Sequence, residues 1–262
     1  MQTWKLEIEY EGTRYRGWQI QENARTVQGE IELAAKDFFK TGLLETGGSG
    51  RTDAGVHALS QFAHLRVFKE IPDITPRKLQ FALNDRLPHD INIRRVSNAL
   101  PKFHARHDAM ERYYVYQIST ERTAFAKNFV WWVKDRLDAA AMNHAVKLLP
   151  GKHDFYSFCD PPPAAVSTLV QVQKAQLYTA DGMILFRIGA SHFLWKMVRR
   201  VVGCLVEIGR GNLSVKNFED FFVKRTRETA PWTAPPSGLF LEKVLYKGDS
   251  PPESTEPIFP IR

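Results

Sequence analysis

The succession of strand-like and helix-like segments, which occurs twice along the chain, limits the fold more than any other feature of the sequence. Apolar and polar residues alternate in residues 4–10, which is typical of a strand with one buried face. Apolar residues then recur at helical spacing in residues 27–39, which predicts an amphipathic helix. The second part of the chain repeats this plan, so we expect an α+β protein built from two halves.

Other segments fit the same plan. Thr75 and Pro76 suit a helix start, because threonine caps helix N-termini and proline is tolerated in the first turn. Asp181 and Gly182 favour a hairpin turn. The further predicted segments are strands at 61–68, 91–96, 112–118, 169–178, 183–188 and 240–246, and helices from 76 to about 85, at 138–149 and at 193–208. We therefore predict domains at residues 1–104 and 105–247, followed by a flexible, proline-rich tail at 248–262.

Composition and charge narrow the class of protein. With 44% hydrophobic and 25% charged residues, the chain can build an ordinary globular core. Its net charge of +7 favours a polyanion such as nucleic acid, although a small anionic substrate fits the charge equally well. The apolar stretch at 193–208 is interrupted by charged residues and is too polar to cross a bilayer.

The two cysteines, Cys159 and Cys204, have no zinc-binding spacing, and no cluster of histidine and acidic residues suggests a metal. No signal peptide precedes the first predicted strand. We therefore expect a soluble cytoplasmic protein with no metal and no membrane partner.

The glycine-rich segment at residues 47–58 is the densest unusual feature. Arg51 and Asp53 lie two residues apart, so an extended backbone would direct both side chains to the same side. A nearby guanidinium favours the ionised form of a carboxylate, and an ionised aspartate in a concave site can act as a nucleophile or base. From the residues alone, a structural turn with an exposed ion pair explains the segment better. A phosphate-binding loop is excluded, because the Lys-Ser/Thr ending is missing.

Residues 50–58, with the sequence GRTDAGVHA, resemble the signature of the TruA family of tRNA pseudouridine synthases. Further blocks resemble the family in the same order along nearly the whole chain up to Tyr246. They are 10–13 with 17–21, 26–28, 82–84 with 87–91, 103–106, 112–116, 153–158, 193–203 and 234–239.

The resemblance implies the reaction. Pseudouridine formation breaks the bond between C1′ and N1 of uridine, turns the uracil, and joins C5 to C1′. Asp53 matches the catalytic position of the family. Its carboxylate can attack C1′, stabilise positive charge there, or take the 2′ proton, and the sequence leaves these three routes open.

Roles for four further residues follow from the same resemblance. Arg199 matches the basic residue that pairs with the catalytic aspartate, and Arg51 matches a position expected to contact RNA or hold the flipped nucleotide. Tyr114 matches the tyrosine that stacks on the target base and assists proton transfer at C5. Leu239 would close the pocket over the uracil. Without the resemblance, all four have ordinary structural explanations. Arg199 would be a solvated charge on a helix and Arg51 an exposed charge on a loop. Tyr114 would be a half-buried aromatic residue of a strand, and Leu239 a core residue.

Four more residues are candidates for RNA contacts, namely Arg14, Arg16, His104 and Arg106. We expect His57 to support the loop rather than act as an acid or base. Neither a cofactor nor a metal is needed for the isomerisation. The chain departs from the family at Val170, where an arginine is usual, so a basic substrate contact is not expected there.

The resemblance also implies an architecture and partners. We expect two RRM-like halves whose antiparallel sheets join into one extended sheet, with helices on the outer face and a basic cleft between the halves. The family acts as homodimers on tRNA, at uridines 38, 39 and 40 of the anticodon stem-loop, and the target must be flipped out of the RNA fold. Two alternatives are an RNA chaperone that only binds, and a glycosylase that releases free uracil.

Overall fold

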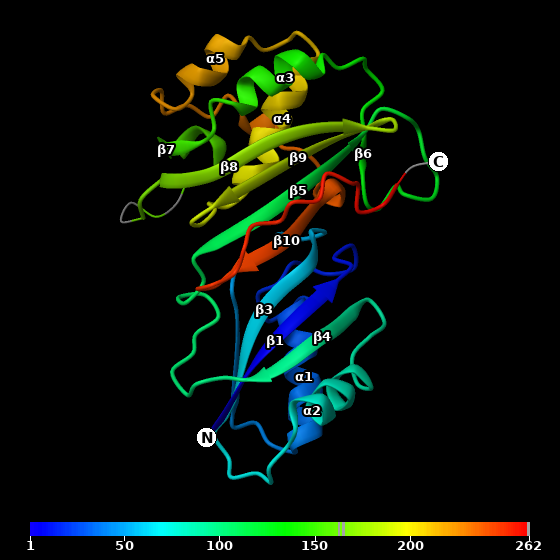
Figure 1. Ribbon diagram of the computed structural model, residues 1–262, viewed down its shortest axis with the longest axis vertical. Coiled ribbons are helices and arrows are strands. Elements are labelled where there is room, and N and C mark those ends of the chain that lie inside the picture. Colours follow the sequence, from blue (N-terminus) through cyan, green and yellow to red (C-terminus); the bar gives the residue numbers. More distant parts are fainter. Residues whose placement is uncertain (162, 164–165, 261–262) are drawn as a thin grey trace. The chain divides into compact units, whose positions relative to one another are not determined.

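One hydrogen-bonded sheet of ten strands organises the fold (Figure 1). The computed structural model describes residues 1–161, 163 and 166–260. The strand order is β4-β1-β3-β10-β5-β9-β8-β7, with β2 paired to β3 and β6 paired to β5. Helices alternate with these strands along the chain, so the predicted α+β class and the joined sheet are confirmed.

By contacts, the chain divides into two units, an N-terminal unit of residues 1–110 with 241–250, and a C-terminal unit of residues 111–240 with 251–262. The predicted domains ended at residues 104 and 247 instead. The elements of the N-terminal unit are β1 (Gln2–Tyr10), α1 (Val27–Phe39), β2 (Leu44–Gly48), β3 (His57–Val67), α2 (Pro76–Asn84) and β4 (Ile91–Asn98). Helix α1 packs on β2 and on α2, and α2 packs on β4.

Alternation and capping explain how the N-terminal unit forms. Trp4, Leu6, Ile8 and Tyr10 are buried along one face of β1, as the sequence pattern predicts. Phe39 at the end of α1 stacks on Trp4, with ring centroids 5.6 Å apart. The side chains of Thr26 and Thr75 accept hydrogen bonds from the first turns of α1 and α2, which fixes where both helices begin.

Most of the last strand, β10, belongs to the N-terminal unit. β10 runs from Leu239 to Leu245, and its residues from Leu241 onward belong to this unit. The Tyr246 ring lies under the ammonium of Lys5, which is 3.5 Å from the ring centroid. The Tyr246 hydroxyl donates to the carbonyl of Ala105 at 2.8 Å. Residues near the two ends of the chain therefore share one small core.

The C-terminal unit contains a longer series of elements, whose helices lie in the upper part of Figure 1. They are β5 (Glu111–Ser119), β6 (Trp131–Trp132), α3 (Ala139–Val146), β7 (Gly151–Asp154), β8 (Leu169–Ala180), β9 (Met183–Ala190), α4 (Met197–Gly209) and α5 (Val215–Asp220), with short 3-10 helices at Tyr156–Phe158, Ala230–Trp232 and Pro236–Gly238. Asp181 and Gly182 both have positive φ, as the predicted hairpin turn between β8 and β9 requires.

Helix α4 begins later than the sequence predicts. It starts at Met197 rather than at residue 193, because Lys196 takes a left-handed conformation with φ +64° and ends the preceding segment. Within α4, Arg200 is only 5% exposed, and its guanidinium donates to a carboxylate oxygen of Asp160 and to the carbonyl of Cys159.

The tail contacts the C-terminal unit. The amide of Ile258 donates to the side-chain oxygen of buried Gln117 at 2.7 Å. The ring of Phe259 stacks on Phe129 with centroids 4.2 Å apart. Both contacts lie in the last segment of the chain, drawn in red in Figure 1. Among the described residues, no helix combines the length and the apolar character needed to cross a membrane.

Candidate active site

Residues 49–56, which link β2 to β3, carry Arg51 and Asp53. The start of this loop is tied to β3. The amide of Ser49 donates to the carbonyl of Phe62 at 2.7 Å, and the side-chain amide of Gln61 donates to the carbonyl of Gly50 at 3.0 Å. Gln61 is fully buried, so these bonds are shielded from water and hold the loop firmly on the strand.

The centre of the loop turns Thr52 inward. Its hydroxyl is hydrogen bonded to the Tyr10 hydroxyl at 2.8 Å, and its carbonyl accepts from the amide of Trp18 at 3.1 Å. Burial raises the pKa of Tyr10, so this phenol stays protonated. The hydroxyl and the carbonyl of Thr52 therefore both hold the loop on neighbouring segments, whereas its two sequence neighbours are less buried.

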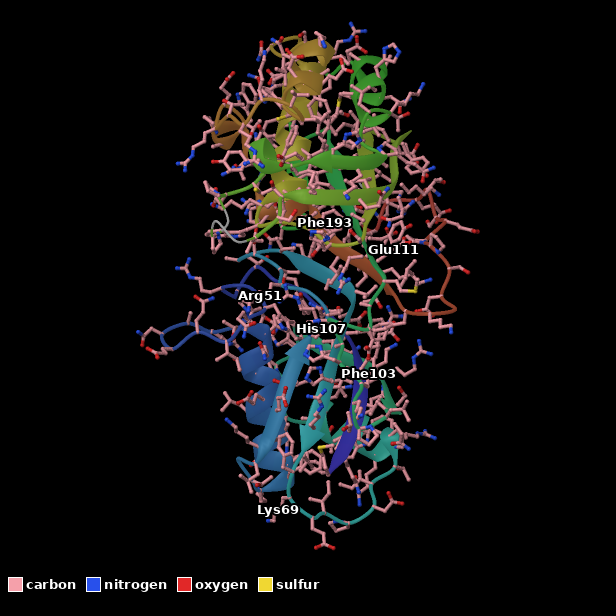
Figure 2. The ribbon with its side chains drawn as sticks, turned by 90° about the vertical axis from the view of Figure 1, so that its left-hand side faces the viewer. Arg51, Lys69, Phe103, His107, Glu111 and Phe193 are labelled. Atoms are coloured by element: carbon pink, nitrogen blue, oxygen red, sulfur yellow. The ribbon has the colours of Figure 1, made fainter. Side chains whose placement is uncertain are left out.

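Those neighbours are Arg51, which is exposed, and Asp53, which is partly buried. Figure 2 shows Arg51 on the loop. Within the described residues, the guanidinium of Arg51 has no hydrogen bond or ion pair. The side-by-side placement that the sequence suggests therefore does not produce an Arg51–Asp53 ion pair, and the guanidinium remains available to a ligand.

The segment at residues 11–18 lies directly against the loop. A Cβ added to Gly12 would sit 2.0 Å from the carbonyl oxygen of Val56. Gly17, with φ +93°, also lies close to the loop, since its added Cβ would be 2.5 Å from the oxygen of Thr52. The amide of Gly12 also donates to Nδ1 of buried His57 at 3.0 Å. Main chain packs on main chain here, which fixes the backbone that carries Asp53.

The C-terminal unit holds the other candidates. Tyr114 lies on β5, is 7% exposed, and packs edge-on against Phe193 with centroids 5.0 Å apart. Figure 2 shows Phe193, which comes from the segment between β9 and α4. This aromatic contact fixes the plane of the Tyr114 ring.

Arg199 on α4 holds the segment that leads into β10. Its Nε donates to the carbonyl of Ala234 at 2.7 Å, while its own carbonyl accepts from the Ala234 amide at 3.0 Å. The Tyr116 hydroxyl donates to the carbonyl of Pro235 at 2.7 Å. Burial raises the pKa of Tyr116, and the charge of Arg199 partly offsets this rise. Leu239, at the start of β10, is 5% exposed and follows this fixed segment.

An ion network holds the start of α4. Asp160 accepts from both Lys196, at 2.6 Å, and Arg200. Burial alone would raise the pKa of Asp160, but the hydrogen bond from Lys196 and the charge of Arg200 lower it. The ionised carboxylate therefore anchors the first turn of the helix that carries Arg199.

The basic candidates differ in their surroundings. Arg14 forms an ion pair with Asp90 at 2.7 Å, with 51% of its side chain exposed. Arg16 and Arg106 are exposed. His104 lies in the chain segment that links β4 to β5. Its ring centroid is 4.7 Å from that of His64 and 4.2 Å from that of His107. Figure 2 shows His107 in the same segment. The position expected to lack a basic residue, Val170, is fully buried in β8.

Several supporting residues carry no signal in the sequence taken alone. Tyr10, Gly12, Gly17 and Trp18 fall in blocks that resemble the family, but only the structure shows that they hold the loop of Asp53. The described part of the chain has no group of three or more histidine, cysteine or acidic residues that could hold a metal ion.

Comparisons with known proteins identify the family of the chain. A family model described as tRNA pseudouridine synthase matches residues 7–108 and 145–247. Proteins named tRNA pseudouridine synthase A are similar over nearly their full length. The one from Geobacillus sp. (strain WCH70) is 39% identical, over 92% of this chain and 97% of its own.

Two further relatives with the same name come from other bacteria. The protein of Rhodopseudomonas palustris (strain BisA53) is 41% identical over 94% of this chain and 100% of its own. The protein of Treponema denticola is 38% identical over 95% of this chain and 96% of its own. The chain therefore belongs to the tRNA pseudouridine synthase family, and it is an isomerase that converts uridine to pseudouridine.

Proposed function

We propose that Asp53 is the catalytic carboxylate of this isomerisation and that its substrates are uridines 38, 39 and 40 of the tRNA anticodon stem-loop. The observation that supports the proposal most is the rigid loop of residues 49–56. In this loop Thr52 is buried and hydrogen bonded to Tyr10, Asp53 is partly buried, and Arg51 is exposed. Such a loop can hold a carboxylate against a ribose without moving during the reaction.

The other candidates supply what the chemistry requires. Tyr114, whose ring plane is fixed by Phe193, would stack on the uracil and assist removal of the proton from C5. Leu239 would cover the base and exclude water. Arg199 would supply the positive charge that complements the catalytic carboxylate. Exposed Arg51 would contact the RNA backbone or hold the flipped nucleotide.

RNA contacts outside the reacting nucleotide would come from Arg14, Arg16, His104 and Arg106. The net charge of +7 supports binding to an anionic RNA, and the basic cleft expected from the resemblance remains a prediction. No cofactor or metal has a role in this scheme, because the bond broken and the bond made lie within one nucleotide.

The test is tritium release from tRNA labelled at C5 of uridine, since joining C5 to C1′ expels that hydrogen. The wild type should release tritium, and Asp53→Ala and Asp53→Asn should lose about 10⁴-fold in rate. Asp73→Asn, which changes an exposed aspartate outside the loop, serves as control and should keep full activity. Persistent release from both Asp53 variants would remove Asp53 from the mechanism, and free uracil among the products would identify a glycosylase.

Site choice, assembly and location have tests of their own. Replacing uridine by cytidine in turn at tRNA positions 38, 39 and 40 should abolish the modification at each replaced position. We also propose that the protein is a homodimer. Light scattering coupled to size exclusion tests this, and finding only monomer at micromolar concentration would contradict it. A tagged chain found outside the soluble cytoplasmic fraction would contradict the proposed cytoplasmic location.

A further inference from the structure

Trp195 presents a large aromatic surface to solvent. Its side chain lies in the segment between β9 and α4 and is 62% exposed, whereas Trp4 and Trp18 are each 1% exposed. An exposed indole offers a large, rigid, flat face that a planar partner can cover.

The backbone around Trp195 is held in place. The carbonyl of Trp195 accepts from the amide of Asp160 at 3.2 Å. The next residue, Lys196, has a left-handed backbone conformation that residues other than glycine rarely adopt. Its ammonium forms an ion pair with Asp160 at 2.6 Å. The exposed ring is therefore carried by a fixed backbone rather than by a loose loop.

The same segment contributes to the candidate site. Phe193, two residues before Trp195, packs on Tyr114, and Arg199 follows four residues after it. Trp195 thus lies in the chain between a residue that holds the proposed base-stacking tyrosine and the arginine proposed to complement the catalytic carboxylate.

Charge favours RNA as the occupant of this surface. The ammonium of Lys196 lies over the indole, 4.7 Å from a ring centroid. A positive charge beside an exposed aromatic ring is the combination by which proteins bind single-stranded nucleic acids, the ring stacking on a base and the cation lying near the phosphates.

We propose that Trp195 stacks on an unpaired base of the substrate RNA that neighbours the target uridine. The inference rests on the proposed action on an anticodon stem-loop, whose loop bases are unpaired. Stacking on Trp195 would hold the flanking nucleotide while the target uridine is flipped out.

The test is the affinity of each variant for a fluorescently labelled anticodon stem-loop RNA, measured by anisotropy. Trp195→Ala should weaken binding about tenfold, because loss of one stacked base is an effect of that order. Trp195→Phe keeps an aromatic face and should stay within about threefold of wild type. The salt dependence of binding should not change, since stacking releases no counterions.

Trp132→Ala is the matched control. Trp132 lies in β6 of the same unit, is 41% exposed, and has the guanidinium of Arg122 5.6 Å from its ring centroid. It therefore shares the exposure and the cation, but it lies outside the segment of Phe193. Its replacement should leave RNA affinity unchanged.

Three results would overturn the proposal. They are unchanged affinity in Trp195→Ala, an equal loss in Trp132→Ala, and a loss of self-association by light scattering without a change in RNA affinity. Circular dichroism checks folding, and Trp195→Gln is a second variant should alanine destabilise the segment. The proposed positions 38, 39 and 40 are judged separately by the uridine-to-cytidine replacements, so a failure of that assignment can be told apart from a failure of stacking.

Discussion

The two units hold their candidate residues by different means. In the N-terminal unit, main chain packs against main chain. Glycines at positions 12 and 17 let residues 11–18 lie directly on the loop of Asp53. In the C-terminal unit, side chains hold the segment before Leu239, since Arg199 donates a hydrogen bond to the carbonyl of Ala234 and Tyr116 donates one to that of Pro235.

This difference predicts opposite sensitivities. A site built from closely packed main chain has no room, so it should be damaged when atoms are added. A site built from side chains that satisfy buried partners should be damaged when atoms are removed, because each deletion leaves a partner unsatisfied. Three experiments test this contrast, in order of decreasing effect, and a fourth, with the smallest expected effect, measures a pH dependence of the N-terminal unit.

The largest effect should come from Gly12→Ala in the N-terminal unit. The new Cβ would lie 2.0 Å from the oxygen of Val56, so the loop must shift, at a cost of about 3 kcal/mol in the free energy of unfolding. Urea denaturation measures the cost. Gly42→Ala is the control, since its Cβ meets no atom within 4 Å, and it should change stability by less than about 0.5 kcal/mol. Equal effects of the two substitutions would refute the close packing.

Removal of atoms should matter most at Arg200 in the C-terminal unit. Arg200→Met leaves Asp160 and the carbonyl of Cys159 without this donor, although Lys196 still binds Asp160. We expect a loss of about 2 kcal/mol, seen as a lower midpoint of urea denaturation. Lys216→Met, which removes an exposed pair on α5, should leave the midpoint unchanged. A stabilised Arg200→Met protein would show that the ion network serves something other than stability.

A smaller effect is expected from Tyr116→Phe. The change removes one hydroxyl and leaves the partly buried carbonyl of Pro235 without its donor, at a cost of about 1 kcal/mol. Because this bond fixes the segment before Leu239, tritium release should also slow. Tyr178→Phe is the matched control, since the Tyr178 hydroxyl has no hydrogen bond within the described residues. If both variants behave like wild type, the hydroxyl of Tyr116 does not position the segment.

The smallest effect should be a pH dependence confined to the N-terminal unit. Burial, then the charge of Arg66, lowers the pKa of His64, while burial, then the charge of His107, lowers that of His104. A lowered folded-state pKa means that the unfolded chain takes up the proton first. The free energy of unfolding should therefore fall as pH drops below the ordinary histidine value of about 6.5.

His64→Asn separates this titration from other acid effects. Nδ1 of His64 accepts the amide of Ala105 at 3.2 Å, a bond that a protonated ring cannot make. The asparagine oxygen can replace that acceptor but does not titrate. Urea denaturation between about pH 8 and pH 5.5 should show a flatter pH dependence in the variant than in wild type. Identical slopes would assign the acid sensitivity to other groups.

The sequence predicts those elements in which local pattern and packing agree. Alternation in β1 and the threonine caps of α1 and α2 are local signals, and the structure keeps all three. β2 (Leu44–Gly48) is missed, because two of its residues are glycines and its pairing with β3 is a long-range contact. The start of α4 is misplaced, since the left-handed turn at Lys196 depends on the distant Asp160.

The site divides in the same way. The pattern of glycines around Arg51 and Asp53 can be seen in the sequence, but its meaning came from resemblance to a family. No local rule predicts that Gly12 faces Val56, or that Arg199 holds Ala234, because both depend on chain segments that meet only in the folded protein. Buried Arg200 shows the same limit, because its partners Asp160 and Cys159 are distant in the sequence.

The shared core of residues near the two chain ends has a consequence for synthesis on the ribosome. Tyr246 packs with Lys5 and Ala105, so the N-terminal unit lacks part of its core until almost the whole chain has been translated. Most of the C-terminal unit is continuous in sequence, from Glu111 to Phe240, and emerges before then. The unit that carries Asp53 is thus translated first but completed only after most of the C-terminal unit has emerged, so a nascent chain arrested before Leu241 should hold its catalytic loop in an unfinished, protease-sensitive state.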